Sequence, residues 1–366
     1  MGRMVHFQMV FVAGCLASAV GGFSATHQGG QGTAPATSSL RGASNRWQVV
    51  YASSNLATHS VSFESSPGDS TTNCPCGMDD VAIVKHGSYA EVISNVRRTN
   101  FYVNAIGYQR FQDTYPDGTA LDLGIFRYKA EIRLPVLPST DPVQTQNAQT
   151  VQMMLQMWDG TNRVWQADKH AIEATMYWGL NAWEGGYYER IKVYTDTTGR
   201  LELVDTGIRL PGDTNWHTVE FVADMVNRKW VSIRVDTNLA DISGIAIPLV
   251  ERTNWGNEVL YHITQESCAT YPGPGYLNIF TWTTEFRNVE LSKLCFFVDL
   301  DATTSGSNNV CLQWDSEPFL KYQVKTSADL RVWGDVPGIL TGTGTNLRYE
   351  ATSPESRLFH RIGVAR

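Results

Sequence analysis

The chain has 366 residues, enough for two ordinary domains or for one large β domain and a small module. Apolar residues make up 42% and charged residues 18%, which excludes a wholly disordered chain. The formal net charge of −7 provides no basic surface for nucleic acid, and no apolar run reaches the length of a membrane-spanning helix. The 11 Trp, 15 Tyr and 31 Gly residues favour short strands and turns over long helices.

The start of the chain is typical of a secretory signal peptide. A positive charge precedes an apolar stretch, and Ala17-Ser18-Ala19 supplies a small-residue cleavage site. We therefore predict a signal peptide over residues 1–19 and a protein that is secreted, periplasmic or on the cell surface. Val12-Ala13-Gly14-Cys15 leaves open a lipoprotein signal. Residues 20–46 are rich in Gly, Ser, Thr and Gln, and are predicted to form a flexible linker.

The cysteines fit an oxidising compartment. After signal cleavage the chain retains Cys74, Cys76, Cys268, Cys295 and Cys311. A mutual disulfide within Cys74-Pro75-Cys76 is disfavoured by bond geometry, so each of this pair is predicted to bond a distant cysteine, leaving one thiol free. No further His or Cys lies nearby at a zinc-ligand spacing, so we predict no metal site there.

β-type segments follow one another between turn signals such as Asp117-Gly118 and Asp159-Gly160. They are Phe101–Ile106, Phe126–Leu134, Thr150–Trp158, Ala171–Trp178, Tyr187–Thr195, Leu201–Leu210, His217–Ala223, Trp230–Asp236, Val259–Thr264 and Tyr276–Leu291. No helical periodicity of useful length appears, which disfavours an α/β architecture. The sequence therefore predicts an all-β, two-sheet sandwich over residues 47–294.

A short polar linker over residues 295–309 precedes a predicted small β module over residues 310–366. The stretches Leu312-Gln313-Trp314, Tyr322–Leu330 and Leu358–Ile362 resemble a fibronectin-III-like accessory module of secreted bacterial proteins. The resemblance covers this module alone. It implies an accessory or attachment role and no chemistry.

The larger domain contains the stretches Trp216–Phe221 and Val231–Asp236 and the terminal strand Phe280–Leu291. In these stretches it resembles the concanavalin A-like lectin/glucanase superfamily. The resemblance implies a jelly-roll β-sandwich, which fixes a fold expectation better than a function.

Side chains alternate across a strand, so residue parity indicates what each face carries. Four of the predicted strands have one apolar face and one face that combines charges, amides and aromatic rings. They are Phe126–Leu134, Thr150–Trp158, Ala171–Trp178 and Tyr187–Thr195. If these strands are neighbours in one sheet, their polar faces form a single surface. Its predicted members are Arg127, Lys129, Glu131, Arg133, Gln152, Gln156, Trp158, Glu173, Tyr177, Tyr188, Arg190, Lys192 and Tyr194, with Trp183 at the rim.

Sugars suit such a surface, because aromatic rings stack on their C–H faces while amides and guanidinium groups bind hydroxyls and carboxylates. Five cations in an acidic protein favour an anionic polysaccharide as the partner. We predict a secreted carbohydrate-recognising protein that binds on a concave sheet face and needs no cofactor. The sequence leaves open a structural calcium site at Gly77–Asp80 or Asp299–Asp301. It also leaves open a third function, that of a structural surface or matrix protein whose sheet face carries cross-strand ion pairs such as Lys129 with Glu173.

A polysaccharide lyase that acts by β-elimination is the alternative function. It needs a group to neutralise the uronate carboxylate, a base to remove the adjacent proton and an acid for the leaving oxygen. Arg133 and Gln156 are the candidate neutralising residues, Tyr188 or Tyr194 the candidate acid and base, and His262 a further candidate base.

The lyase hypothesis also has a faint sequence likeness. Lys129-Ala130-Glu131-Ile132-Arg133 and Gln156-Met157-Trp158 are similar to the Arg-x-Glu-Leu-Arg and Gln-Ile-His strands of alginate-type lyases, with Lys129 and Trp158 as departures. A glucanase of the jelly-roll type carries its carboxylates on one strand as Glu-x-Asp-x-x-Glu or a close variant, and no such spacing occurs here.

Overall fold

The computed structural model describes residues 47–53, 80–96, 103–116, 122–136, 148–158, 170–181, 188–197, 200–251, 256–271, 280–294, 303–304, 309–352 and 359–365. The chain divides into two units, one of residues Val49–Lys293 and one that comprises Met1–Gln48 and Leu294–Arg366. Every regular element within the described ranges is a strand. Those ranges contain no helix that is long and apolar enough to cross a membrane.

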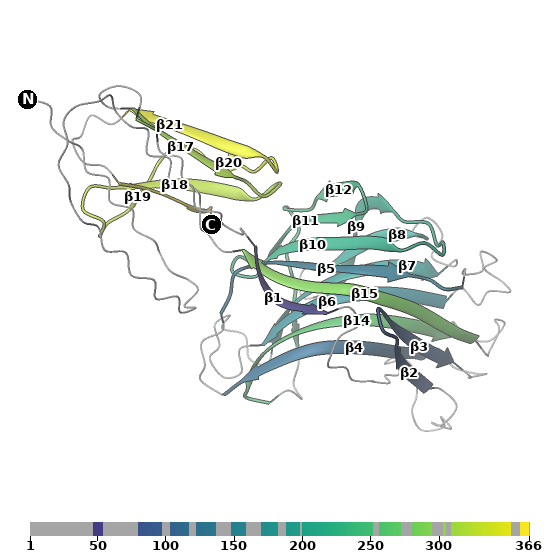
Figure 1. Cartoon of the computed structure of the whole chain (residues 1–366). Coiled ribbons are helices and arrows are strands. Elements are labelled where there is room, and N and C mark those ends of the chain that lie inside the picture. The colour runs from purple at the N-terminus through teal and green to yellow at the C-terminus, as the bar shows by residue number, and fades with distance from the viewer. Residues whose placement is uncertain are drawn as a thin grey trace, which may run out of the picture. The chain divides into compact units, whose positions relative to one another are not determined.

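The first layer of the larger unit is an eight-stranded sheet of antiparallel strands (Figure 1). Its order is β12 (Asn238–Asp241), β11 (Lys229–Val235), β10 (His217–Asp224), β5 (Ile125–Arg133), β15 (Phe280–Leu294), β3 (Ala90–Val96) and β2 (Asp80–Lys85), and β1 (Trp47–Ser53) pairs with β15. β5 therefore lies between β10 and β15.

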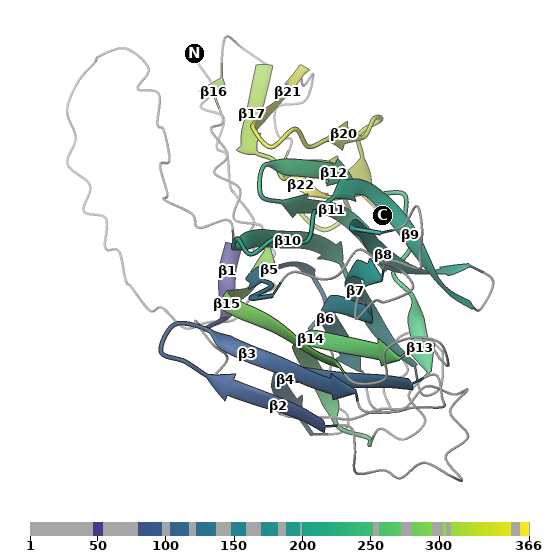
Figure 2. The ribbon, with the colours of Figure 1, turned by 90° about the vertical axis from the view of Figure 1, so that its right-hand side faces the viewer.

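The second layer is a seven-stranded sheet. Its order is β4 (Val103–Tyr115), β14 (Val259–Tyr271), β6 (Ala148–Trp158), β7 (His170–Asn181), β8 (Arg190–Thr197) and β9 (Arg200–Arg209), and β13 (Leu249–Glu251) also pairs with β7. Figure 2 shows β6, β7 and β14 side by side, as the pairing requires. Together the two sheets confirm the predicted all-β jelly-roll sandwich.

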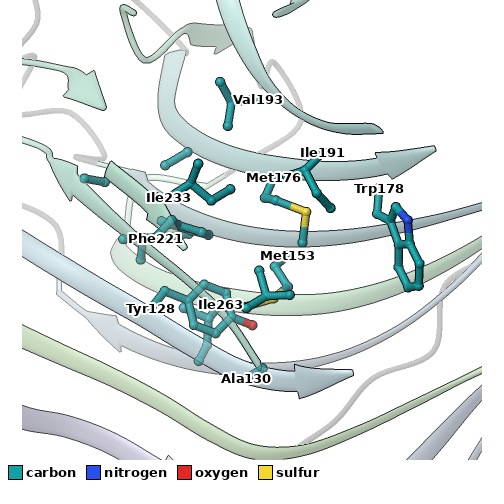
Figure 3. Packing of buried hydrophobic residues seen from close by; sticks show 14 of the residues in the cluster. Tyr128, Ala130, Met153, Met176, Trp178, Ile191, Val193, Phe221, Ile233 and Ile263 are labelled. Carbon is teal, nitrogen blue, oxygen red and sulfur yellow. The ribbon is translucent and has the colours of Figure 1, made fainter. Parts of the chain in front are cut away.

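Alternating apolar side chains fill the space between the sheets. Met153, Met176 and Trp178 of the seven-stranded sheet belong to the same buried cluster as Tyr128 and Phe221 of the eight-stranded sheet (Figure 3). Burying one side chain of this size contributes about 1.5–3 kcal/mol. A one-residue slip in register would turn each such set outward, so the core fixes which face of every strand points away from the sandwich.

All ten predicted strands are present, but one expectation about their arrangement is wrong. β6, β7 and β8 are neighbours, whereas β5 belongs to the opposite sheet. The four strands therefore do not form one surface. The reason is physical: alternation tells which side chains share a face of a strand, but both sheets of a sandwich carry the same pattern, so alternation does not assign a strand to a sheet.

The smaller unit contains two short sheets. One has the order β16 (Thr303–Thr304), β17 (Asn309–Asp315) and β21 (Asn346–Thr352); the other has β19 (Gly334–Asp335), β18 (Lys321–Ser327) and β20 (Leu340–Thr341), with β22 (Phe359–Val364) also paired to β18. Trp314 and Tyr322 are buried with their ring centroids 5.8 Å apart in an edge-to-face contact. Cys311 on β17 is a free cysteine.

Candidate functional site

The outward side of the seven-stranded sheet carries the strongest concentration of polar and aromatic groups. Its positions alternate with core residues such as Met153, Met176 and Ile263, so they point away from the sandwich. We call this set the polar face. It consists of Gln152, Met154, Gln156, Trp158, Glu173, Thr175, Tyr177, Arg190, Lys192, Tyr194, His262, Thr264 and Glu266.

A line of three functional groups crosses the middle of the polar face. Gln156 on β6 is directly opposite Glu173 on β7 and directly opposite His262 on β14. Directly opposed residues of antiparallel strands have Cβ atoms about 4.5–5.5 Å apart. The register therefore aligns a carboxyl, an amide and an imidazole group on three neighbouring strands. His262 was a separate candidate in the sequence, and the pairing of β6 with β14 is what brings it beside Gln156.

A second line runs parallel to the first. Lys192 on β8 is opposite Tyr177 on β7, which is opposite Gln152 on β6, which is opposite Glu266 on β14. The ammonium nitrogen of Lys192 lies 5.1 Å from the centroid of the Tyr177 ring, a cation–π contact.

Two further contacts order this part of the face. The ring of Tyr177 meets that of Tyr194 edge-on at 6.3 Å and an interplanar angle of 89°. The hydroxyl of Thr264 donates a hydrogen bond of 2.8 Å to a carboxylate oxygen of Glu266. The aromatic and carboxylate groups are therefore held in defined positions.

Burial separates the polar face from an ordinary wet sheet surface. Gln156 is 2% exposed, Glu173 and Lys192 are each 4% exposed, and His262 is 5% exposed. Removing charged groups from water is unfavourable unless specific contacts offset it, and such groups concentrate at functional sites. Gln152, Met154 and Tyr194 are partly exposed. These three give a ligand direct access, while the buried groups lie beside them.

Trp158 lies at one end of the polar face, next to the line that contains Glu173. The indole N–H of Trp158 donates a 3.0 Å hydrogen bond to the carbonyl of Gly256, and the residue is 1% exposed. Trp158 is therefore a packed side chain without an open ring face for stacking. The backbone N–H of Glu173 bonds to the carbonyl of Pro248 at 3.2 Å, just before β13 joins the same edge of β7.

The candidates on β5 have a different setting on the outward side of the eight-stranded sheet. Arg127 forms a 2.9 Å ion pair with Glu290, and Arg133 is paired with Glu285. Glu131 is bound by Arg287 at 2.6 Å. These are cross-strand pairs between β5 and β15, so the ion-paired arrangement foreseen as an alternative holds for this strand.

Two corrections follow for β5. Lys129 is opposite Glu220 on β10 and Glu290 on β15, so the expected Lys129–Glu173 pair is wrong, because these residues belong to different sheets. For the same reason Arg133 does not join Gln156 as a second carboxylate-neutralising group. Burial raises the pKa of Glu131, but hydrogen bonds from Asn288 and Arg287 outweigh it, and the pKa lies below its usual value.

The remaining candidates lie at or beyond the edge of the face. Tyr188 is partly exposed in a turn that precedes β8, and Arg190 forms a 3.7 Å ion pair with Asp205 of β9. Between them Glu189 has a left-handed backbone (φ 57°), and its carboxylate accepts hydrogen bonds from Arg209 at 2.7 Å and from the N–H of Gly212 at 3.0 Å. Glu189 thus fixes the entry to β8.

Several predicted features fall outside the described residues. These are Trp183, Cys74, Cys76, Cys295, the signal peptide and the two acidic turns considered for calcium, apart from the backbone of Asp80 in β2. Within the described ranges no group of three or more His, Cys, Asp or Glu side chains is arranged to hold a metal ion.

Sequence reasoning missed two polar members of the face. Thr264 was included in a predicted strand but not in the predicted surface, and Glu266 was in neither. The predicted strand ended at Thr264, whereas β14 continues to Tyr271. The inward positions after Ile263, Gln265 and Ser267, are themselves polar, so no alternation of apolar and polar residues marks Glu266 in the sequence.

No family model matches the chain, and no match was found among curated proteins. Similar solved structures include the catalytic domain of a laminarinase from Thermotoga petrophila, at 12% identity, TM-score 0.35 and 68% of this chain against 98% of that one. An alginate lyase from Chlorella virus has 12% identity, TM-score 0.32 and coverage of 59% and 90%. Winged bean acidic lectin has 10% identity, TM-score 0.34 and coverage of 66% and 95%. Likeness at this level concerns the fold and assigns no activity to this chain.

Proposed function

We propose that this protein recognises a polysaccharide on the polar face of its seven-stranded sheet. The supporting observation is the line Glu173–Gln156–His262, in which carboxyl, amide and imidazole groups face outward and are nevertheless almost completely buried. Beside this line, Gln152 and Tyr194 are partly exposed. A planar amide and an aromatic ring are the groups that bind sugar hydroxyls and C–H faces.

The charge of the face bears on the class of polysaccharide. The expectation of an anionic polymer rested on five cations, of which only Arg190 and Lys192 lie on this sheet, and Arg190 is paired with Asp205. Glu173 and Glu266 add two carboxyl groups to the same face. We therefore propose a neutral polysaccharide as the preferred ligand, because a polyanion would meet carboxylates at the centre of the face.

Affinity electrophoresis tests this proposal with laminarin as a neutral probe and alginate as an acidic probe. We expect retardation by the neutral polymer, and a smaller retardation for Gln152→Ala and Tyr194→Ala. Arg127→Ala is the matched control, because Arg127 lies on the opposite sheet. Retardation by alginate alone would overturn the neutral preference. Unchanged mobility in a full panel of neutral and acidic glycans would remove the binding proposal.

Lyase activity is the second candidate, and one observation favours it. The register places His262 opposite Gln156, with the rings of Tyr177 and Tyr194 on the same face. An amide to neutralise a uronate carboxylate, an imidazole base and a phenol acid are the group types that β-elimination needs. The test is the ultraviolet absorbance of unsaturated uronide during incubation with alginate or glucuronan. A rise that His262→Gln abolishes supports the lyase; no rise with any polyanion eliminates it.

A further inference from the structure

His217 lies between two carboxylates at the start of β10. This strand belongs to the eight-stranded sheet, whereas the polar face belongs to the seven-stranded sheet. Its Nδ1 lies 2.8 Å from Oδ2 of Asp236, in the turn between β11 and β12. Its Nε2 lies 2.9 Å from Oδ1 of Asp213, in the segment that precedes β10. The residue is 9% exposed, so water competes weakly for these bonds. Three parts of the chain are thereby joined through one imidazole ring.

The number of protons on the ring decides whether both bonds form. An ionised carboxylate only accepts hydrogen bonds, and a neutral imidazole has one N–H and one lone pair. Both contacts together therefore require the imidazolium form, with each ring nitrogen donating. On loss of one proton, one nitrogen presents a lone pair to a carboxylate, and that contact becomes repulsive.

The geometry also indicates which contact is lost. Asp236 is independently held, because its Oδ1 accepts a 2.9 Å hydrogen bond from the backbone N–H of Thr218. Asp213 also has a second bond, 2.7 Å from the backbone N–H of Asn215 to its Oδ1, but Asn215 belongs to the same Pro211–Trp216 segment, so this bond does not tie the segment to the sheet. The neutral ring therefore keeps its donor toward Asp236 and releases Asp213.

The segment that Asp213 anchors ends in Trp216. The partly exposed ring of Trp216 lies 4.1 Å from the guanidinium carbon of Arg287 and 4.7 Å from that of Arg133. Its centroid lies 6.1 Å from that of Tyr89, in an edge-to-face contact. Release of Asp213 within the segment thus frees the backbone that carries Trp216, whose ring contacts these guanidinium groups of β5 and β15.

We propose that His217 is a pH-sensitive latch that holds the Pro211–Trp216 segment, and with it Trp216, against the eight-stranded sheet, and that raising the pH opens it. This inference is independent of the proposed function. Among the described residues, the charged groups that face His217 are Asp213 and Asp236; β7 contributes the ring of Trp178 at 6.5 Å, and β5 contributes Ile132 opposite it in register.

The direction of titration agrees with the latch. Burial lowers the pKa of His217, but the hydrogen bonds to Asp236 and Asp213 outweigh burial and raise it above its usual value. A raised histidine pKa contributes stability that is fully present at low pH and lost as the pH rises through the folded-state pKa. Asp213 has a lowered pKa, so its contribution is lost only as the pH falls through that lower value. The latch is closed between these two limits.

Nuclear magnetic resonance of histidine ring nitrogens in the full chain tests the protonation state, with His217→Gln assigning the resonance. We expect His217 to stay doubly protonated to a higher pH than an ordinary histidine, and Asp213→Asn and Asp236→Asn each to lower its pKa. A His217 that titrates at or below the ordinary histidine value of about 6.5 overturns the proposal.

Hydrogen exchange tests the opening itself. After correction for the intrinsic pH dependence, amides of residues 212–216 should exchange about tenfold faster above the His217 pKa than below it, as expected for loss of one charge-assisted hydrogen bond. Amides of β11 provide the internal control. Asp213→Asn, which keeps a hydrogen-bonding side chain, should lose this pH dependence, and it serves even if His217→Gln fails to fold. Equal protection of the amides of residues 212–216 across the titration contradicts the latch.

Discussion

Gln156 and His262 occupy directly opposite positions on β6 and β14, although they are far apart in the sequence. On its other side Gln156 is opposite Glu173 of β7. An amide group is therefore flanked by a carboxyl and an imidazole group on the outward side of one sheet. All three side chains are buried, which distinguishes this line from the half-buried, ion-paired positions on β5.

Lys192→Met is predicted to separate function from stability. Methionine retains the length of the buried stem over Tyr177 while removing the ammonium group. Replacing a buried charge by an apolar group of similar volume is often neutral or stabilising. We expect a thermal midpoint equal to or above that of the natural protein and a weaker retardation by the polysaccharide. A lower midpoint together with unchanged binding would show that Lys192 is structural.

Tyr128→Phe is predicted to weaken the contact between the two sheets. The buried phenol of Tyr128 on β5 donates a 2.8 Å hydrogen bond to the backbone carbonyl of Thr264 on β14. Burial, with further contributions from Glu266 and Tyr51, raises the pKa of Tyr128 well above its usual value, so the phenol stays protonated. Tyr128→Phe removes this bond and also leaves the buried side-chain amide of Gln265, which donates to the phenol oxygen, without its acceptor. We expect a loss of about 1–3 kcal/mol in the free energy of unfolding, measured by urea denaturation. Tyr115→Phe, at an exposed position, should change the free energy of unfolding by less than about 0.5 kcal/mol.

Gly342→Ala is predicted to disrupt the smaller unit. A Cβ at this position would lie 1.8 Å from the backbone carbonyl oxygen of Glu317. Because this oxygen belongs to the backbone, no side-chain rotation can relieve the clash. The same glycine exchanges backbone hydrogen bonds with its neighbours, including a 2.7 Å bond to the carbonyl of Leu320. We expect the free energy of unfolding of this unit, measured by calorimetry, to fall by more than about 3 kcal/mol.

Gly363→Ala is the matched control for that substitution. A Cβ on Gly363 would meet no atom within 4 Å, and this glycine also lies on a strand of the smaller unit. The free energy of unfolding of the Gly363→Ala variant should equal that of the natural protein or exceed it by up to about 0.5–1 kcal/mol. Similar losses in both variants would mean that the close approach of Gly342 to Glu317 does not limit stability.

The sequence was informative where alternation is strict. In β6, Val151, Met153, Leu155 and Met157 are core residues, and the even positions between them face outward, as parity predicted. The same rule separated the faces of β7 and β8. These strands are central, so their packed sides need uninterrupted apolar residues.

Sheet membership and edge strands were not accessible from the same pattern. β5 has alternation as clear as that of β6, yet it pairs with β10 and β15, because pairing depends on contacts between residues distant in the chain. β1, β2, β3, β12 and β13 were not predicted at all. Exposed residues such as Val49 and Val50 on β1 weaken the periodic signal of such strands.

The central claim is that the ligand-binding surface lies on the seven-stranded sheet, and a dissociation constant measured for paired variants tests it most directly. With the polysaccharide that retards the natural protein, isothermal titration should give about a tenfold weaker affinity for Tyr194→Ala, equivalent to about 1.4 kcal/mol. Arg127→Ala, on the opposite sheet, should bind as the natural protein does. A normal affinity for Tyr194→Ala together with a weakened Arg127→Ala would contradict the account.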